Sequence, residues 1–299
     1  MSDDIKFEYT IKENEKELRI KELLKRNFGF SSRFMRKLKA NDCVRLNGAP
    51  VKMNEKGNPG DRVTVLLPPE NSDFEPEKIP ISVIYEDDDL LIINKQPGYV
   101  VHPTKGHPRH TIANGIMNYM LENGKHFKIR FINRLDMDTS GLLAVAKNSH
   151  CQDDLQNQML ENSVIKKYLA VVRGIVGEES GTINLPIGLE QEDKVRRTVV
   201  EGGFPSVTHF KVLERFPKGY TLLEITLDTG RTHQIRVHMS HIGHPVVGDA
   251  LYGETSVWLI ERQALHASFL SFRHPIINRC MEFEAPLPDD MLRLLEKIR

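Results

Sequence analysis

Cysteine, tryptophan and long apolar runs are scarce in this chain of 299 residues. The three cysteines, Cys43, Cys151 and Cys280, lie far apart, which argues against a disulfide framework and against a C-x-x-C metal pair. We expect three reduced, buried thiols. No apolar run approaches the roughly 20 residues that span a bilayer, and the opening segment MSDDIKFEYT lacks the apolar core of a secretion signal. We therefore expect a cytoplasmic protein without membrane contact.

The signatures of several cofactor- and metal-dependent enzymes are also missing. The chain has no G-x-x-x-x-G-K-[ST] phosphate loop, no G-x-G-x-x-G dinucleotide fingerprint and no G-x-S-x-G nucleophile elbow. It also lacks the H-x-E and P-C-x-x-C pair of zinc-dependent base deaminases. We therefore expect a reaction that needs no cofactor, and no metal site.

Charge is abundant but unevenly placed. Lys+Arg and Asp+Glu both number 41, yet Leu18–Arg45 carries nine basic residues against two acidic ones. A one-sided basic patch is typical of a surface that binds a polyanion such as RNA, although a solvated helical face would have the same pattern. The candidate RNA-binding residues of this patch are Arg19, Lys25, Arg26, Arg33, Arg36, Lys37 and Lys39.

The basic patch is predicted to belong to a small N-terminal domain of two helices followed by a sheet. Apolar residues at helical spacing predict a first helix that includes Leu18–Phe28, and Ser32 is placed to cap a second one. An Asn-Gly turn and a β-rich segment after Gly60 predict the sheet. The acidic, proline-rich stretch PPENSDFEPEKIP fits an extended connector. The expected organisation is a domain over residues 1–70, a linker over 71–82 and a second domain over 83–299.

The second domain has mainly strand-like patterns, interrupted by helices. A hairpin is expected from Ile81–Tyr85 and Leu90–Asn94, around an Asp-rich turn. Apolar residues at helical spacing predict helices, and β-rich segments predict further strands. The expected helices cover 111–122, 149–161 and a closing segment from Asp289 or Asp290 to Ile298, and the expected strands cover 142–147, 168–173, 208–214 and 220–227.

The polar stretch Asn133–Gly141 directly precedes the apolar run Leu142–Ala146. Polar residues that lead into a buried strand suggest a site, where Asp136 could be held ionised and aimed as a nucleophile or base. A turn closed by Asp and Ser side chains explains the same residues, and the local pattern alone favours the turn.

A second polar cluster, Gly230–Pro245, contains four histidines and two arginines. It has no H-E-x-x-H motif and no neighbouring Cys/Glu set, which disfavours a zinc site. Two interpretations remain open. The histidines could be satisfied within the structure, or Arg231 and Arg236 could lie near a carboxylate or near RNA phosphates.

Taken in order, these segments resemble the RluA/RluD family of RNA pseudouridine synthases. The basic N-terminal region resembles the alpha-L (ribosomal protein S4-like) RNA-binding domain that often precedes this catalytic domain. The resemblance implies an α+β fold: a mainly antiparallel mixed β-sheet with flanking helices, preceded by a small α+β domain. The matching segments, between about Pro80 and Pro286, are Val83–Leu91, Asn94-Lys95, Pro97-Gly98, Val101–Pro103, Arg134–Gly141, Lys167–Ala170, Gly230–His238, Gly243–Pro245, Gly248-Asp249, Leu251–Gly253 and Leu265–Ala267.

The resemblance also implies a reaction: the bond from ribose to a uracil ring nitrogen breaks, the base rotates, and it rejoins through carbon five. Asp136 would start the cleavage, either by attack on the anomeric carbon or by removal of a ribose proton. Tyr168 would stack on the flipped base and assist proton removal at carbon five, whereas without the family match it is typical of a core strand residue. For the ion pair with Asp136 we choose Arg231, with Arg236 as its rival, and Arg134 is expected to displace the target nucleotide or hold the RNA backbone.

Two positions depart from the family pattern, with Asn133 where histidine is usual and Gln96 where proline is usual. Because an asparagine cannot titrate, a proton-transfer role at position 133 would be excluded. The expected partner is large-subunit ribosomal RNA, with transfer RNA as the alternative, and the expected state is a monomer. A non-catalytic RNA-binding or ribosome-assembly protein on the same fold is the main rival hypothesis, and a metal-dependent hydrolase is a more distant one.

Overall fold

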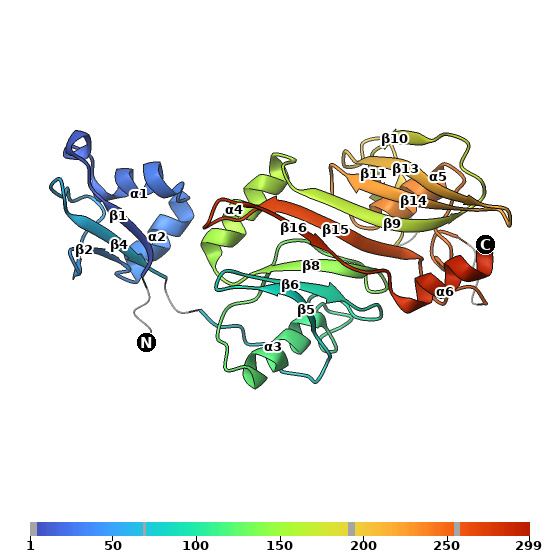
Figure 1. The fold of residues 1–299 in the computed structure, drawn as a ribbon, viewed down its shortest axis with the longest axis horizontal. Coiled ribbons are helices and arrows are strands. Elements are labelled where there is room, and N and C mark those ends of the chain that lie inside the picture. The colour runs from blue at the N-terminus through green and yellow to red at the C-terminus, as the bar shows by residue number, and fades with distance from the viewer. Residues whose placement is uncertain (1–4, 68–69, 191–194, 254–257) are drawn as a thin grey trace.

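The computed structural model describes residues 5–67, 70–190, 195–253 and 258–299. Residues 5–67 form a small unit at one end of the molecule, called here the N-terminal module, and the closing helix α6 (Asp289–Ile298) lies at the other end (Figure 1). Among the described residues, no helix has both the length and the apolar composition needed to cross a membrane.

The N-terminal module packs two helices on a four-stranded sheet of order β1-β4-β2-β3. Its core buries Leu23 and Leu24 of the first helix and Phe34 and Leu38 of the second, as their helical spacing predicts. The elements are β1 (Ile5–Thr10), the 3-10 turn η1 (Glu13–Glu15), α1 (Ile20–Phe28), α2 (Ser32–Ala40), β2 (Val44–Leu46), β3 (Ala49–Pro50) and β4 (Arg62–Leu66).

Two details of this module differ from the sequence prediction. The sheet begins with β1, a strand that precedes both helices and was not predicted. Helix α2 is capped by Ser31 rather than Ser32, because the Ser31 Oγ accepts a hydrogen bond from the Phe34 backbone N–H at 3.1 Å, whereas Ser32 is already helical.

The rest of the chain is built on a ten-stranded sheet with flanking helices, so the predicted α+β fold is confirmed. Its order is β10-β13-β14-β9-β15-β8-β6-β5, with β16 paired to β15 and β7 to β8. Every pairing is antiparallel except that of β15 with β8. The strands are β5 (Ser82–Glu86), β6 (Leu90–Lys95), β7 (Arg130–Phe131), β8 (Ser140–Ala146), β9 (Ile165–Arg173), β10 (Ser180–Asn184), β13 (Val207–Phe216), β14 (Tyr220–Leu227), β15 (Leu265–Arg273) and β16 (Cys280–Glu284).

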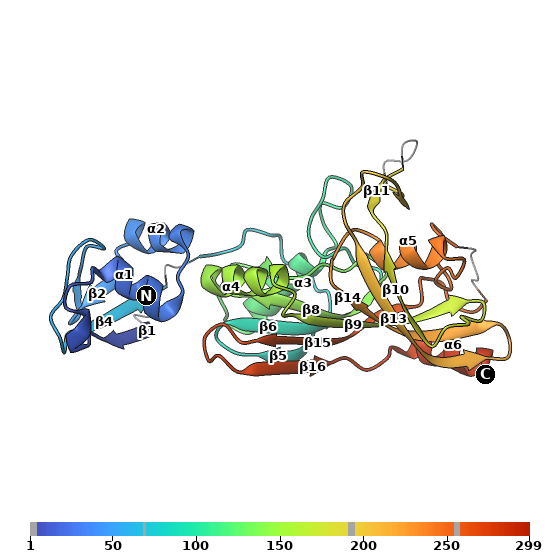
Figure 2. The same ribbon diagram turned by 90° about the horizontal axis from the view of Figure 1, so that it is seen from above.

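Helices cover both faces of the β6 and β8 part of this sheet. Leu91 and Ile93 of β6 pack in one cluster with α3 (Ile112–Glu122), whereas Leu90 and Ile92 pack in another with α4 (Ser149–Leu160). Alternate strand residues point to opposite faces, which explains why this strand is an unbroken apolar run. Two further elements lie near β14: the small pair β11 (Ile187–Leu189) and β12 (Arg197–Val199), and helix α5 (Gln234–His241) (Figure 2).

The predicted linker, residues 71–82, has no helix or strand until β5 begins at Ser82. It is nevertheless fixed to the larger unit, because Ser72 Oγ accepts a hydrogen bond from Ile129 N at 2.8 Å and Glu75 O accepts one from Asn114 Nδ2 of α3 at 2.7 Å. Hydrogen bonds between side chains and backbone groups thus hold the segment to the fold without regular secondary structure.

The cysteines are reduced thiols, as predicted, but not all are buried. Cys43 and Cys151 lie in the cores of the two units, whereas Cys280 is exposed. Cys280 begins β16, where the strand turns Phe283 toward the core and leaves alternate side chains outside.

Candidate active site

Asp136 lies in the loop that joins β7 to β8, at the entrance to the buried strand. The Thr139 backbone N–H donates to the Asp136 carbonyl at 3.1 Å, so the turn suggested by the sequence is present and carries the site as well. Gly141 follows with a φ of +110°, and a Cβ there would lie 2.2 Å from the Ala267 carbonyl of β15. Only glycine fits this close parallel pairing, which fixes the loop against the sheet.

The buried side chain of Lys95 holds the backbone of this loop in place. Lys95 Nζ donates to the carbonyls of Met137 at 2.7 Å, Thr139 at 2.9 Å and Gln96 at 3.1 Å, which uses the three donors of an ammonium group. Burial lowers the pKa of Lys95 to about 7. Because these contacts reach only carbonyls, Lys95 positions the loop and leaves the Asp136 carboxylate available.

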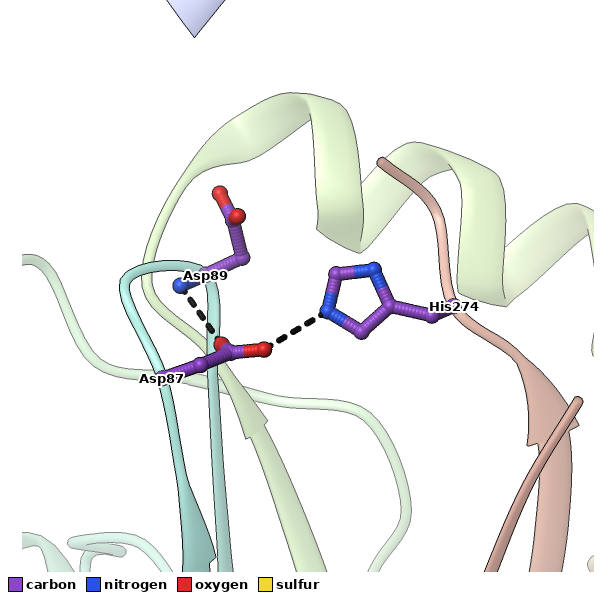
Figure 3. A group of neighbouring side chains, drawn as sticks. All are labelled: Asp87, Asp89 and His274. Carbon is purple, nitrogen blue, oxygen red and sulfur yellow. Dashed lines mark hydrogen bonds and ion pairs between the residues drawn. The ribbon is translucent and has the colours of Figure 1, made fainter. Parts of the chain in front are cut away.

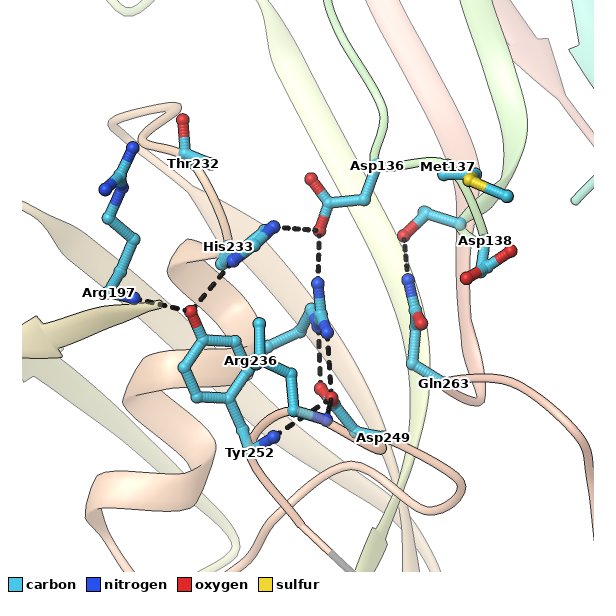
Figure 4. A network of polar contacts seen from close by, with 12 residues as sticks. Asp136, Met137, Asp138, Arg197, Thr232, His233, Arg236, Asp249, Tyr252 and Gln263 are labelled. Atoms are coloured by element: carbon cyan, nitrogen blue, oxygen red, sulfur yellow. Dashed lines mark hydrogen bonds and ion pairs between the residues drawn. The ribbon is translucent and has the colours of Figure 1, made fainter. Parts of the chain in front are cut away.

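The Asp136 carboxylate is paired with Arg236 of α5. Arg236 Nη1 donates to Asp136 Oδ2 at 3.1 Å, and the same guanidinium grips Asp249 through Nε at 2.6 Å and Nη2 at 2.8 Å (Figure 4). Burial opposes the charge of Arg236, but the hydrogen bonds and charge of Asp249, together with Asp136, raise its pKa. Within the described chain, the side-chain bonds to Asp136 go to Oδ2, so Oδ1 is the oxygen available to a substrate.

The prediction that Arg231 forms this ion pair is corrected by the structure. Arg231 precedes α5, where its Nε donates to the Pro205 carbonyl at 3.3 Å and its guanidinium lies over the Phe204 ring, 5.6 Å from the centroid. Arg236 is inside the helix on its buried side. Only 8% of the Arg236 side chain is exposed, and its predicted contact with RNA stays a prediction.

His233, which was not predicted to act in the site, is the other side chain next to Asp136. Its backbone is left-handed, with φ 58°, an uncommon conformation for a residue other than glycine. The Tyr252 hydroxyl accepts from Arg197 N at 2.8 Å and lies 2.8 Å from His233 Nδ1, so its proton is directed to Nδ1. The Nε2–H of His233 then faces Asp136 Oδ2, 3.9 Å away. Burial lowers the pKa of His233, which favours this neutral form.

Tyr168 lies on β9, buried, and lines two cavities together with Asp136. Burial, and then the charge of Asp136, raise the pKa of Tyr168, so its phenol stays protonated at neutral pH. The larger of these cavities has a volume of about 690 Å³. A space of this size is within the range of small-molecule sites, and it places an aromatic ring beside the carboxylate.

A third cavity, of about 1130 Å³, meets the 690 Å³ cavity at Asp136. Arg134 and Thr232 line both spaces, and Arg134 Nη2 donates to Thr232 Oγ1 at 3.3 Å. Arg134 is exposed, in agreement with a role toward a ligand at the entrance.

The predicted basic residues of the N-terminal module divide into two groups. Arg33 and Lys37 of α2 line the 1130 Å³ cavity together with Asp136. The others are exposed on the module but do not line it: Arg19, Lys25, Arg26, Arg36 and Lys39. Among these candidate residues, only Arg33 and Lys37 of α2 bring the N-terminal module to this cavity.

Two histidines of the second polar cluster have structural hydrogen bonds. His238 is fully buried, with Nδ1 2.9 Å from Thr208 Oγ1 and Nε2 3.0 Å from the Leu185 carbonyl. His244 Nδ1 lies 2.9 Å from the Arg173 carbonyl. The structural interpretation thus holds for these two, while His233 faces the site.

Within the described ranges, the one grouping of three candidate metal ligands is Asp87, Asp89 and His274 (Figure 3). His274 Nδ1 accepts from the Ile276 backbone N–H at 3.1 Å, so its proton lies on Nε2, which is 2.8 Å from Asp87 Oδ2. Asp89 Oδ2 is 2.7 Å from Lys6 Nζ. These atoms are committed to hydrogen bonds and an ion pair, so the grouping is a structural network at the β5–β6 turn.

Asn133, the main departure from the family pattern, holds the backbone of β8. Its Nδ2 donates to the Leu142 carbonyl at 3.0 Å, and its Oδ1 accepts from Ala144 N at 2.8 Å. The amide thus acts like one more strand residue at the edge of β8. The Asp136–Arg236 pair therefore loses no proton carrier when asparagine stands at position 133 in place of the family histidine.

Comparison with known proteins agrees with this geometry. A family model described as RNA pseudouridylate synthase matches residues 89–241, a range that contains Asp136, Tyr168 and Arg236. The chain is 47% identical over 260 residues to the uncharacterized RNA pseudouridine synthase YlyB of Bacillus subtilis, covering 86% of each chain. It is 40% identical over 267 residues to ribosomal large subunit pseudouridine synthase D of Nitrosomonas europaea, covering 86% of this chain and 77% of that one.

A solved structure, human RNA pseudouridylate synthase domain containing 1, has 31% sequence identity and a TM-score of 0.58, over 73% of this chain and 86% of that chain. The fold and the carboxylate site thus define an RNA-modifying isomerase. The chain belongs to the RNA pseudouridylate synthase family, which confirms the resemblance stated from its sequence. It is an enzyme that converts uridine in RNA to pseudouridine.

Proposed function

We propose that the protein converts one or more uridines of large-subunit ribosomal RNA to pseudouridine, with Asp136 as the catalytic carboxylate. The pairing of Asp136 with the buried Arg236–Asp249 pair, beside Tyr168 and two cavities, is the observation that carries this proposal. Relatives named ribosomal large subunit pseudouridine synthase D match most of the chain and support the choice of RNA.

In this proposal, the target uridine leaves its stack and enters the 690 Å³ cavity, with its ribose at Asp136 and its base beside Tyr168. Asp136 Oδ1 initiates cleavage of the glycosidic bond, while Arg236 keeps Oδ2 in place. Both routes, attack at the anomeric carbon and removal of a ribose proton, use this same oxygen. The detached uracil rotates in the cavity and bonds through carbon five.

Tyr168 has two roles in this account. Its ring stacks on the flipped base, and its hydroxyl assists removal of the proton from carbon five after the new bond has formed. The raised pKa of Tyr168 means that it acts as a protonated phenol at neutral pH unless a base accepts its proton. Asp136 lines the same cavity as Tyr168, and its carboxylate is the group proposed to accept that proton.

The 1130 Å³ cavity would hold the RNA strand that flanks the target. Its walls combine Arg134 at the entrance with Arg33 and Lys37 from the N-terminal module. Cationic side chains of this kind offset the cost of flipping, about a few kcal/mol, through contacts with phosphates. The protein is proposed to act in the cytoplasm, where such RNA is assembled, and its monomeric state stays a prediction.

The proposal is tested by mapping pseudouridines in ribosomal and transfer RNA from cells with and without this gene. We expect one or more large-subunit sites to lose pseudouridine and to regain it when purified wild-type protein is added to the unmodified RNA. Loss confined to transfer RNA would contradict the proposed substrate, and complete retention of all sites would contradict the proposed function.

A further inference from the structure

A carboxylate directly before the linker, that of Glu70, lies in the wall of the 1130 Å³ cavity. Glu70 contacts one cation from each unit. Its Oε1 pairs with Lys37 Nζ of α2, and its Oε2 accepts a hydrogen bond from Arg130 Nη2 of β7. Burial acts against the charge, but the bonds and charges of Lys37 and Arg130 lower the pKa of Glu70. The carboxylate is therefore an anion held between two cations in a space that also reaches Asp136.

Arg130 is preorganised for an anion. Only 7% of its side chain is exposed, and Nη1 donates to the carbonyls of Lys128 at 3.0 Å and Lys147 at 3.3 Å. These bonds fix the guanidinium plane and leave Nη2 to the cavity, where it meets Glu70. A buried guanidinium without an anion is costly, so a negative charge at this position stabilises Arg130.

The N-terminal module is docked so that Lys37 stays at this place. The module lies beside the end of the sheet that carries α4 (Figure 2). Ser31 Oγ donates to Asp153 Oδ2 at 2.7 Å, and Lys37 Nζ donates to Ser149 Oγ at 3.3 Å. Lys6 of β1 pairs with Asp89, one of the three residues in Figure 3, and this ion pair adds another contact between the module and the larger unit.

Apolar packing supports the same docking. The His150 ring of α4 is enclosed by Phe7, Phe30 and Phe34, with ring centroids 5.2, 5.1 and 5.5 Å away. Aromatic groups at these separations attract each other beyond the area they bury. Lys37 and Arg130, which are 93 positions apart in sequence, are therefore presented together by the fold.

We propose that Lys37 and Arg130 form a phosphate-binding subsite for the RNA backbone, and that Glu70 occupies this subsite in the free protein. The proposal rests on the proposed function, since it assigns a contact to the RNA that enters the catalytic cavity. A phosphodiester carries one negative charge and two free oxygens, so it can accept the same two donors as the Glu70 carboxylate. RNA binding would then exchange one anion for another without leaving Arg130 unpaired.

The position of Glu70 favours this exchange over a purely structural ion pair. Arg33, Lys128 and Arg134 line the same cavity, so a strand that runs toward Asp136 passes further cations on either side. The carboxylates of the linker itself differ: Glu75 pairs with Arg109 and Glu77 with His110, and neither these two nor Asp73 lines the cavity. Of these carboxylates, Glu70 is the one in the wall of the cavity proposed to hold the RNA.

The test compares Glu70→Gln with Glu75→Gln as a matched control that removes the same charge in the linker itself. Equilibrium binding of a fluorescent, structured RNA hairpin is measured at several salt concentrations, because phosphate contacts do not depend on sequence. Glu70→Gln is expected to bind about three- to tenfold more tightly than Glu75→Gln, since an ion pair of about 1 kcal/mol corresponds to about fivefold in affinity. Equal or weaker binding by Glu70→Gln would overturn the exchange, leaving Glu70 as a tie between the two units.

A second pair of variants keeps the test decisive if Glu70→Gln disturbs the docking. Lys37→Ala and Lys39→Ala change neighbouring lysines of α2, of which only Lys37 lines the cavity. Lys37→Ala is expected to weaken binding more and to reduce the salt slope by about one. Equal effects of the two would contradict the subsite. Failure of the wild-type protein itself to bind RNA would instead refute the proposed function.

Discussion

The two cationic regions of this protein differ in how their charges are held. In the N-terminal module, Arg19, Lys25 and Arg36 project from the surface, free to adapt to a mobile polyanion. Around Asp136 the cations are buried: Arg236 is paired with two carboxylates, and Lys95 is surrounded by backbone carbonyls. Exposed charge gives affinity and speed of encounter, whereas buried charge fixes geometry.

Glu70 lies where the two regions meet. It links Lys37, a half-buried lysine of the N-terminal module, to Arg130, a buried arginine of the larger unit. The comparison therefore predicts that variants of the buried set affect folding and chemistry, and that changes to the exposed set affect binding.

The largest effect is expected from Asp249→Ala, which breaks the buried pair. Arg236 would keep only its bond to Asp136, and a buried charge left without its partner costs about 3–5 kcal/mol of folding stability. Chemical denaturation measures this change, with Asp138→Ala as a control in the neighbouring loop. A loss below about 1 kcal/mol would show that Asp249 is not needed to hold the arginine.

Deletion of the N-terminal module, up to about Pro68, is expected to act mainly on binding. RNA affinity should fall by about 100-fold at moderate salt, because several phosphate contacts disappear. The single-turnover rate on saturating RNA should stay within about threefold of the full chain, since Asp136, Tyr168 and Arg236 remain. Equal RNA affinity of the full chain and the deletion variant would contradict the assignment of binding to one region and chemistry to the other.

Lys95→Met tests the buried lysine beneath the catalytic loop. Three carbonyls would lose their donor, so we expect a loss of about 1–3 kcal/mol near pH 7. The pKa of Lys95 is about 7 in the folded protein and about 10.4 when unfolded, so the unfolded state binds more protons between these values. Wild-type stability should therefore rise, relative to Lys95→Met, between pH 7 and pH 9. A parallel pH dependence of the two proteins would contradict this assignment.

The smallest effect is expected from Asn133→His, which restores the residue usual in the family. Asn133 bonds the backbone of β8 and lies apart from the Arg236 pair, so the single-turnover rate should change by less than about threefold. A gain of tenfold or more would show that the family histidine contributes to the chemistry and that this chain has lost that contribution.

Much of the fold could be predicted because its elements follow simple apolar patterns. The β5–β6 hairpin, α4 and α6 lie within a residue or two of the predicted ranges. Helix α5 was missed because several of its buried residues, Gln234, Arg236 and His238, are polar. Polar residues that serve a site interrupt the very pattern on which helix prediction depends.

The site was predicted in part for a related reason. Asp136 and Tyr168 could be found by ordered matches along the chain, but the choice between Arg231 and Arg236 depended on where α5 begins and on which side it buries. The role of His233 depends on a left-handed backbone and on the Tyr252 hydroxyl, which is 19 positions away. Such contacts arise only from the tertiary structure.

The most direct measurement of the central claim compares Asp136→Asn with Asp138→Asn. Each removes one carboxylate charge from the same loop, but only Asp136 faces Arg236. Binding and pseudouridine formation would be measured on the ribosomal RNA identified by mapping. We predict that Asp136→Asn binds this RNA and forms no pseudouridine, whereas Asp138→Asn remains active. Pseudouridine formation by Asp136→Asn at a rate near that of the wild type would contradict the account.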